Sequence, residues 1–314
     1  MRKIIALAMF SATLLCAASP DISGVWKADL QKSKLAGPPG PPPSNYLVII
    51  EQKMAEFNHR TKEQAPEIVE TTGVWGQRGE QRSVLTVFNN GKPIIRTYQG
   101  VPTRLTASSQ GNTLTVTGEV AGRPNSFTRT YELSPDGNTL AVSIVNKNNG
   151  KETQSSLVLT KQPDAAGEPL RKPEELAGAH FKNVKTTSLK SLPESEFINQ
   201  MRYIAWSLNR DCAFCHVERK FDSDDKKEKK TARKMIDMVA AIDQNHFEGH
   251  PEVRCFTCHE GHAHPLSHPQ FPEEAAAEKA ALEKAAAERA AERGAPGPRQ
   301  PGSGHPPPSG GPRQ

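Results

Sequence analysis

Large apolar side chains are scarce in this 314-residue sequence. Hydrophobic residues make up 35% of it and aromatic residues 6%, whereas globular chains usually have roughly 45–50% apolar residues when glycine is counted among them. Only one long apolar run is present, at the N-terminus. The sequence therefore excludes a polytopic membrane protein, a collagen and a coiled coil, and it indicates that part of the chain belongs to no protein core.

The N-terminal run predicts export. Residues 1–18 have Arg2 and Lys3, then an apolar stretch, then small residues before a cut after Ala18, which is typical of a cleaved secretory signal peptide. The stretch is short for a membrane span of ~20 residues. An uncleaved signal or lipidation of Cys16 would instead give peripheral membrane association, but the bulky Leu15 before Cys16 favours cleavage and a periplasmic protein.

Residues 20–163 read as an antiparallel β barrel. Short β-branched runs alternate with Asn-Gly and Asp-Gly turn signals at roughly 8–12-residue spacing. The expected strands include 46–50, 83–88, 113–120, 126–133 and 139–145. Gly24 and Trp26 resemble the G-x-W start of lipocalin-like barrels, so we predict a lipocalin-like meander that docks, anchors or binds a small ligand.

The remaining chain divides into three segments of different composition. Residues 164–180 form a polar linker rich in proline, and residues 181–271 carry helical periodicity together with the cysteine motifs. Residues 272–314 comprise an Ala/Glu/Lys helix without an apolar face and a Pro/Gly-rich disordered tail. We therefore predict a multidomain protein, with a β barrel followed by a small α-helical domain.

Four cysteines remain after the signal peptide, and all lie in C-x-x-C-H motifs. Cys212 and Cys215 precede His216, and Cys255 and Cys258 precede His259. Two thiols at this spacing reach the two vinyl groups of one porphyrin, and the following histidine then serves as the proximal iron ligand. Structural zinc and a thioredoxin-like pair are the alternatives, but the long separation and the absent βαβ pattern favour two covalent c-type haems.

The sixth iron ligands are sought among the methionines. Met201 shares a helical face with apolar residues before the first motif, and Met235 does so before the second. Methionines on such faces usually fill a core, but a domain this small must take much of its core from porphyrin. We predict Met201 and Met235 as ligands, with Met238 and His250 as competitors for the second haem.

The C-terminal part resembles the photosynthetic reaction-centre cytochrome c subunit family. The likeness spans about 181–265 and includes Phe181-Lys182-Asn183-Val184, Leu192-Pro193, Met201, Leu208, both C-x-x-C-H motifs, Ala232 to Ile236, Phe247, Gly261 and Pro265. It implies one helix–turn–C-x-x-C-H unit per haem, with Met201 and Met235 as the helix methionines. The family typically carries four haems in two such pairs, whereas this chain has one pair.

These observations predict an exported dihaem cytochrome that carries single electrons between redox protein partners. No catalytic residues are assigned, and nothing resembles a nucleic-acid surface. The alternatives are a peroxidase-type dihaem enzyme and a haem-based redox or ligand sensor that uses the barrel. Removing Arg2 and Lys3 and adding four haem propionates takes the net charge from +5 to about −1. The alternating charge run 218–234 is accordingly interpreted as solvated surface.

Overall fold

The computed structural model describes residues 19–36, 41–55, 65–77 and 79–294. The predicted signal peptide, with Cys16, and the final part of the predicted tail lie outside these residues. The described residues up to Ala263 form one compact unit, and those from His264 onward form a second.

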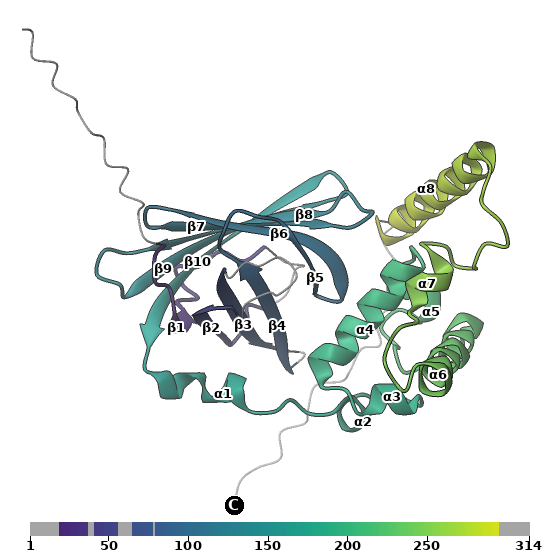
Figure 1. The fold of residues 1–314 in the computed structure, drawn as a ribbon, viewed down its shortest axis with the longest axis horizontal. Helices are drawn as coiled ribbons and strands as arrows, with labels where there is room; N and C mark the ends of the chain where they lie inside the picture. Colours follow the sequence, from purple (N-terminus) through teal and green to yellow (C-terminus); the bar gives the residue numbers. More distant parts are fainter. Residues whose placement is uncertain (1–18, 37–40, 56–64, 78, 295–314) are drawn as a thin grey trace, which may run out of the picture. The chain divides into compact units, whose positions relative to one another are not determined.

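The first part of the chain is an up-and-down β sheet whose ten strands curl into a nearly closed barrel (Figure 1). Each strand pairs antiparallel with its sequence neighbour except that β4 and β5 form no ladder, and β1 also pairs with β10. The strands are β1 (Gly24–Ala28), β2 (Asn45–Met54), β3 (Pro66–Gly76), β4 (Gly79–Phe88), β5 (Ile94–Tyr98), β6 (Val101–Gln110), β7 (Thr113–Val120), β8 (Ser126–Leu133), β9 (Thr139–Asn148) and β10 (Lys151–Gln162).

The turn signals in the sequence lie between these strands. Asn149 and Gly150, with φ of 49° and 80°, are the two residues that join β9 to β10. Positive φ at both central positions is the type I′ geometry that matches the twist of a β hairpin. The predicted meander is therefore confirmed, including the bounds of β7 and β8.

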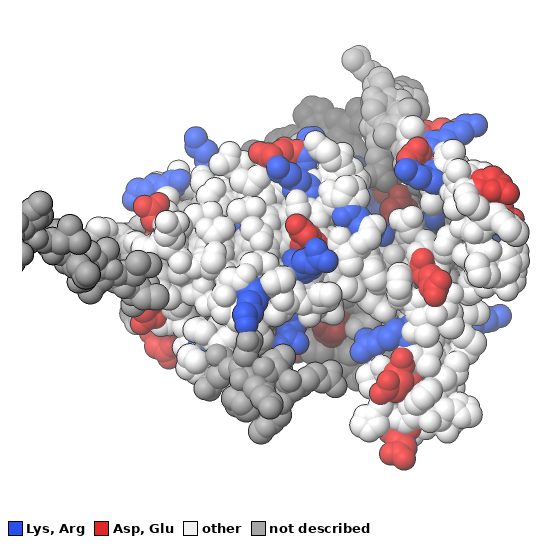
Figure 2. Space-filling view, turned by 45° about the horizontal axis from the view of Figure 1, so that its top comes forward, with Lys and Arg blue, Asp and Glu red and all other residues white. Residues whose placement is uncertain are grey.

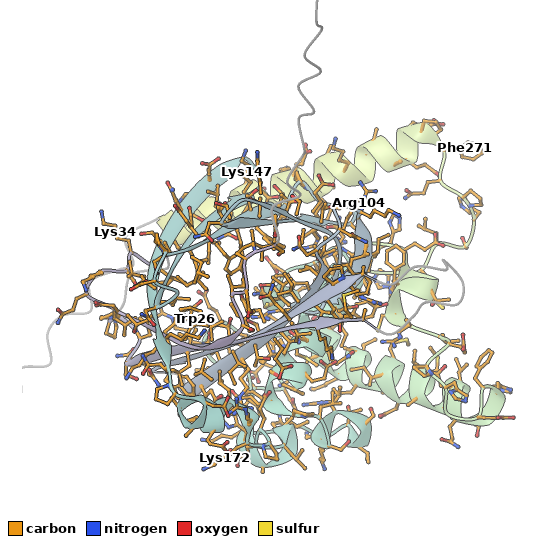
Figure 3. All side chains as sticks on the ribbon, turned by 60° about the vertical axis from the view of Figure 1, so that its left-hand side comes forward. Trp26, Lys34, Arg104, Lys147, Lys172 and Phe271 are labelled. Atoms are coloured by element: carbon orange, nitrogen blue, oxygen red, sulfur yellow. The ribbon has the colours of Figure 1, made fainter. Side chains whose placement is uncertain are left out.

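Alternation along the strands builds the barrel core. Trp26 is fully buried in the interior (Figure 3), and its indole nitrogen donates a 2.9 Å hydrogen bond to the carbonyl of Ile22. Val48, Leu105, Leu140 and other apolar side chains from successive strands pack around it. Since every second residue of a strand faces inward, the alternating pattern accounts for this core.

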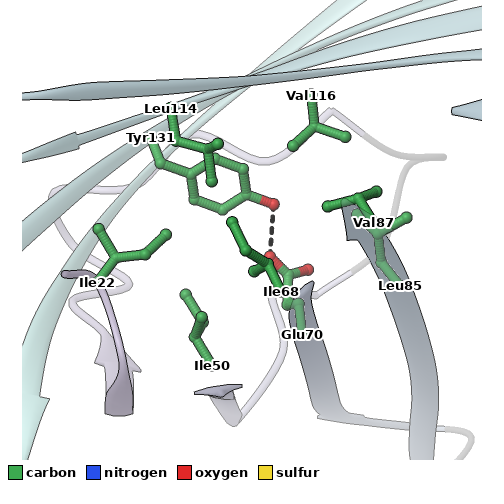
Figure 4. Close-up of a pocket in the computed structure, with 9 residues that line it drawn as sticks. All are labelled: Ile22, Ile50, Ile68, Glu70, Leu85, Val87, Leu114, Val116 and Tyr131. Carbon is green, nitrogen blue, oxygen red and sulfur yellow. Dashed lines mark hydrogen bonds between the residues drawn. The ribbon is translucent and has the colours of Figure 1, made fainter. Parts of the chain in front are cut away.

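A charged group is buried inside the barrel. Glu70, 7% exposed, accepts hydrogen bonds from the Tyr131 hydroxyl and from the Arg129 guanidinium, which also donates to the hydroxyl of Tyr98. Burial raises the pKa of Tyr131. Beside this cluster lies a mostly apolar cavity of about 10 Å³ (Figure 4), which is the space of a single water molecule. A ligand larger than water at this point would have to displace the side chains that line the cavity.

A helix lies against the seam of the barrel. Helix α4 (Glu194–Ser207) packs on β4 and β6, while the turn between β5 and β6 meets it at Gly100. Gly100 has φ +84°, and a Cβ there would lie 2.2 Å from the backbone oxygen of Asn199. Only glycine allows both this backbone conformation and this close approach.

The segment 164–180 is not a simple linker. It contains the short helices η1 (Asp164–Gly167), α1 (Glu168–Arg171) and α2 (Ala177–His180). Leu170 is buried on the outer face of the barrel against Val25, Leu47 and Ile49. Arg82 of β4 donates hydrogen bonds to the carbonyls of residues 169, 170 and 172. These contacts fix the start of the helical region to the barrel.

Short and long helices follow the barrel. They are α3 (Thr187–Lys190), α4, α5 (Cys212–Cys215), α6 (Lys227–His246), α7 (Cys255–His259) and α8 (Pro272–Gly294). Helix α8 belongs to the second unit and consists mainly of alanine, glutamate, lysine and arginine, as the sequence predicts. None of the helices in the described residues is long and apolar enough to cross a membrane.

Candidate functional site

Each C-x-x-C-H motif folds as a single helical turn. Cys212 and Cys215 are the first and last residues of α5, and Cys255 and Cys258 lie in α7. Residues three apart on a helix are neighbours on one face, so each turn presents its two thiols on the same side. Cys212 and Cys258 are exposed, and Cys215 and Cys255 are partly buried. This arrangement suits two thioether bonds to one flat group.

Two side-chain oxygens secure these turns at their N-terminal ends. The Asp211 carboxylate accepts a 3.2 Å hydrogen bond from the backbone nitrogen of Phe214, as an N-cap of α5. The Thr257 hydroxyl accepts a 3.0 Å bond from the backbone nitrogen of Arg254, which precedes α7. Because N-terminal amides of a helix lack internal partners, these bonds stabilise turns that would be too short to persist alone.

Both motif histidines have the same orientation. The Nδ1 atom of His216 lies 3.0 Å from the carbonyl oxygen of Phe221, and that of His259 lies 2.9 Å from the carbonyl oxygen of His262. A carbonyl oxygen only accepts, so each Nδ1 carries a proton, and in the neutral imidazole the lone pair is then on Nε2. This is the tautomer that an Nε2 iron ligand requires.

Burial shifts the pKa values of several groups in the two motifs. It lowers the pKa of His216, despite the opposing hydrogen bond to Phe221, and it raises the pKa of the Cys215 thiol. Burial also raises the pKa of the Cys255 thiol in the second motif. The lowered pKa of His216 favours its neutral form, which is the form that binds metal.

The helical region has almost no apolar core. Between residues 181 and 263, all of which are described, the buried residues are polar: Thr186, Ser207, Lys229 and Asp243. Large apolar side chains stay exposed, among them Phe221 at 59%, Phe247 at 40% and Phe256 at 39%. Helices of a soluble domain need an apolar partner for such residues, and two porphyrins would supply it.

Packing in this region joins the two motif units to each other. Helix α4 packs on α7, and α5 packs on α6. The indole of Trp206 in α4 stacks on Phe256 of α7, with ring centres 4.6 Å apart, and Gly261 donates a 2.9 Å hydrogen bond to the carbonyl of Ser207. Neither α4 with α5 nor α6 with α7 makes a comparable contact in the described residues. Each motif is thus left without a packed partner helix from its own unit.

The candidate sixth ligands lie on the two longer helices. Met201 is partly buried in the middle of α4, whereas Met235 and Met238 on α6 are 41% and 45% exposed. His250 is exposed in the loop that follows α6. The helices that the sequence places before each motif are therefore present, and each carries the methionine named for it. Nothing in the geometry distinguishes Met235 from Met238.

Asp224 fixes the segment at the start of α6 through contacts that the sequence did not predict. Its carboxylate lies 2.7 Å from Lys185 Nζ, 2.9 Å from Arg233 Nη1 and 3.4 Å from Lys229 Nζ, and it accepts a 2.8 Å hydrogen bond from Asn183. The hydrogen bond from Lys185 chiefly holds the pKa of Asp224 far below its ordinary value. Asp224 thus ties the segment before α3 to α6.

The expected start of α6 is wrong. Local capping preferences suggest Asp222 or Ser223 as its N-cap, but α6 begins at Lys227. Lys226 occupies the cap position, and its side chain makes no capping hydrogen bond to the helix. Lys226 instead donates to the carbonyl of Ala213 in α5, and Asp224 is committed to its cationic partners. Tertiary contacts therefore shorten the helix that local capping preferences favour.

Asp243, a position where the family resembled more often has an amide, has a structural role that the sequence did not predict. It is 9% exposed, and its Oδ1 accepts a 3.0 Å hydrogen bond from the backbone nitrogen of Val253, two residues before Cys255. Its carbonyl accepts from the backbone of Phe247 and Gly249. Asp243 therefore fixes the loop between α6 and the second motif.

The four cysteines do not gather at one point. Within the described ranges, no group of three or more His, Cys, Asp and Glu side chains is placed to hold a bare metal ion. The alternative of a shared structural zinc needs such a group. The paired thiols, the oriented histidines and the missing apolar core fit a covalently attached porphyrin in each motif.

Two solved structures match part of the chain only distantly. A mutant of the fluorescent protein UnaG covers 45% of this chain and 96% of its own length, at 12% identity and a TM-score of 0.31. Secretory abundant heat soluble protein 4 from Ramazzottius varieornatus covers 45% and 95%, at 12% identity and a TM-score of 0.27. Scores this low support no argument about the barrel.

A family comparison covers much more of the chain than the resemblance noted in the sequence. The model for the photosynthetic reaction centre cytochrome C subunit matches residues 128–295, which is just over half of the 314 residues. The match begins in β8, runs through both C-x-x-C-H turns and includes α8. This chain belongs to the photosynthetic reaction centre cytochrome C subunit family.

Proposed function

We propose that the protein is an exported dihaem c-type cytochrome that carries single electrons between redox protein partners. The observation that supports it best is the pair of C-x-x-C-H turns, each with its histidine Nδ1 bonded to a backbone carbonyl. Covalent haem supplies an iron that exchanges one electron at a time. Membership of a cytochrome family supports an electron carrier rather than an enzyme.

The residues divide into three roles. Cys212 and Cys215 would hold the first haem, and Cys255 and Cys258 the second. His216 and His259 would bind iron through Nε2, since Nδ1 of each is already committed to a carbonyl. Met201 and Met235 would complete the coordination, with Met238 and His250 as the competitors at the second haem.

The surrounding chain would keep the iron ligation fixed. Hydrogen bonds from Nδ1 prevent each imidazole ring from rotating, and α4 is anchored to the barrel through Trp206, whose indole donates a 3.0 Å bond to the carbonyl of Ala121. An electron carrier benefits from such rigidity because a site that does not reorganise exchanges electrons with little structural cost. The barrel would serve as a scaffold or docking module for this region.

Redox-titrated optical and magnetic spectra of the exported protein test the proposal. We expect two haems per chain that resist extraction by acidified solvent, and two six-coordinate low-spin irons in both oxidation states. A haem-stained gel and the intact mass give the haem count independently. A chain without covalent haem would refute the proposal, and a high-spin haem that readily binds carbon monoxide would favour a peroxidase-type enzyme.

Substitution of the methionines tests the sixth ligands. Met201→Ala should remove one of the two methionine–iron bands in the near-infrared spectrum and lower the potential of one haem, because methionine ligation raises the potential. Met235→Ala should do the same for the other haem. Met238→Ala is the matched control, three residues along the same helix, and it should leave both bands intact. Loss of a band in Met238→Ala would reassign the second haem.

A further inference from the structure

The structure separates the charges of the run 218–234 into two groups. Asp224 forms ion pairs with Lys229 and Arg233, and both cations also donate hydrogen bonds to backbone carbonyls near the start of α6. Lys227, Lys230 and Lys234 are exposed, and they form no ion pair within the described residues. The sequence alone, in which the signs alternate, does not distinguish these groups.

The exposed lysines share one face of α6. At 100° per residue, positions 227, 230 and 234 fall within about 60° of one another. The buried face, with Lys229 and Asp243, lies on the opposite side. Two acidic residues of α6 lie nearest this face: Glu228 is partly buried away from it, and the exposed Asp237 at its margin offsets only one of the three positive charges. A net positive stripe therefore faces solvent.

An apolar side chain lies at the end of the stripe. Met238 lies one turn beyond Lys234 on the same side of the helix and is 45% exposed. Protein interfaces typically combine apolar contacts with a polar rim, and methionine is enriched in them. The lysine face, defined here as Lys227, Lys230 and Lys234 with Met238, has both parts.

The lysine face is close to a haem motif. Helix α5, which carries Cys212 and Cys215, packs on α6, and Lys226 donates to the carbonyl of Ala213 between these two cysteines. The stripe begins at the next residue, Lys227. A partner bound there would approach the first haem, and electron exchange requires that approach.

The charge on the barrel is arranged differently. Figure 2 shows lysine and arginine side chains interspersed with aspartate and glutamate over the visible face, without a large patch of one sign. Interspersed charge keeps a protein soluble but does not direct a partner. The uncompensated lysines on α6 select for the opposite sign.

We propose that the lysine face of α6 is the docking surface for a redox protein with an acidic patch around its own electron-transfer site. The proposal rests on the proposed function, since it assumes that haem is attached to the adjacent motif. The lysines bring the partner to the first haem by long-range attraction, and Met238 contributes the apolar contact. Association of this kind is faster at low ionic strength and loses its advantage as salt rises.

The test compares two triple variants of the full-length haem-loaded protein. K227E/K230E/K234E reverses the lysine face, and K27E/K151E/K172E makes the same change in charge at exposed lysines outside it. Stopped-flow spectroscopy follows oxidation of each reduced protein by plastocyanin with an acidic patch. We expect the first variant to react at least tenfold more slowly at about 10 mM ionic strength, the control to change less than threefold, and the difference to disappear near 0.5 M salt.

Three outcomes would overturn the proposal. Equal rates for both variants would show that the lysine face does not direct docking. A loss of haem content in the first variant alone would mean that these lysines stabilise the haem. Binding of the wild type to phosphatidylserine vesicles, lost in the first variant with unchanged plastocyanin kinetics, would assign the face to a membrane. A protein without haem fails at the first absorbance spectrum, so failure of the proposed function is recognised separately.

Discussion

The barrel and the helical region differ in what fills their interiors. The barrel buries Trp26, Leu105, Leu140 and many other apolar side chains to 1% exposure or less. In the helical region between residues 181 and 263 the buried residues are all polar, and several phenylalanines are exposed. One region thus carries its core in its own sequence, whereas the other, we infer, receives its core from a cofactor. Stability should therefore depend on haem in only one of them.

The largest expected effect comes from removing both haem attachments. With Cys212, Cys215, Cys255 and Cys258 all changed to alanine, helices α4 to α7 should lose their fold, because metal and cofactor binding supplies folding free energy to domains without a core. Amide hydrogen exchange followed by mass spectrometry should show unprotected α4 and α6 beside a protected barrel. Full protection of α4 and α6 in this variant would contradict the comparison.

The converse experiment removes the centre of the barrel. Trp26→Ala should lower the free energy of unfolding of the barrel by about 3–5 kcal/mol, from lost burial and the cavity that remains. The haem bands should be unchanged in the absence of denaturant. Urea denaturation followed by circular dichroism provides the measurement. Ile95→Ala is the control, since Ile95 is 70% exposed on β5 and should change stability by less than about 0.5 kcal/mol.

The junction between the regions should give an intermediate effect. Gly100→Ala introduces both backbone strain and a clash with Asn199 of α4, whereas Gly122→Ala has a similar φ of +68° and open space around its Cβ. Strain alone should cost about 1–2 kcal/mol in each variant. A larger loss in Gly100→Ala, with altered hydrogen exchange in α4, would measure the coupling between the regions. Equal losses of unfolding free energy in the two variants would indicate that the contact between Gly100 and Asn199 contributes nothing to stability.

The smallest expected effect concerns Asp224 and depends on pH. The pKa of Asp224 is lowered in the folded protein. Its contribution to the free energy of unfolding is therefore fully present above the ordinary aspartate pKa of about 3.9 and is lost as pH falls through the lowered value. Asp224→Asn should therefore lower the thermal midpoint at pH 7, and the deficit should shrink as pH falls below about 4. Differential scanning calorimetry from pH 3 to 7 tests this. Asp225→Asn, at an exposed neighbour, is the control.

Local patterns predicted much of the barrel and both motifs. The alternation in residues 113–120 and 126–133 gives the bounds of β7 and β8, because a half-buried strand repeats every two residues. The C-x-x-C-H spacing likewise requires nothing beyond the motif itself. In these places the physical cause lies within a few residues of its effect.

Contacts between distant segments could not be predicted in the same way. Leu170 is a single apolar residue in a polar stretch, and only the outer face of β1 and β2 gives it a partner. Asp224 meets Asn183 and Lys185 about forty residues away, so nothing local indicates that it is used there rather than as a helix cap. The acceptors for His216 and His259 depend on the path of the following loop.

Those acceptors have an evolutionary consequence. The oxygens that hold the two imidazole rings belong to the main chain at Phe221 and His262, so no single amino-acid replacement deletes either of them. Insertions or deletions in 217–221 or 260–262 would move them out of reach. Relatives that retain this arrangement should therefore vary freely in the identity of these residues while conserving the length of both intervals.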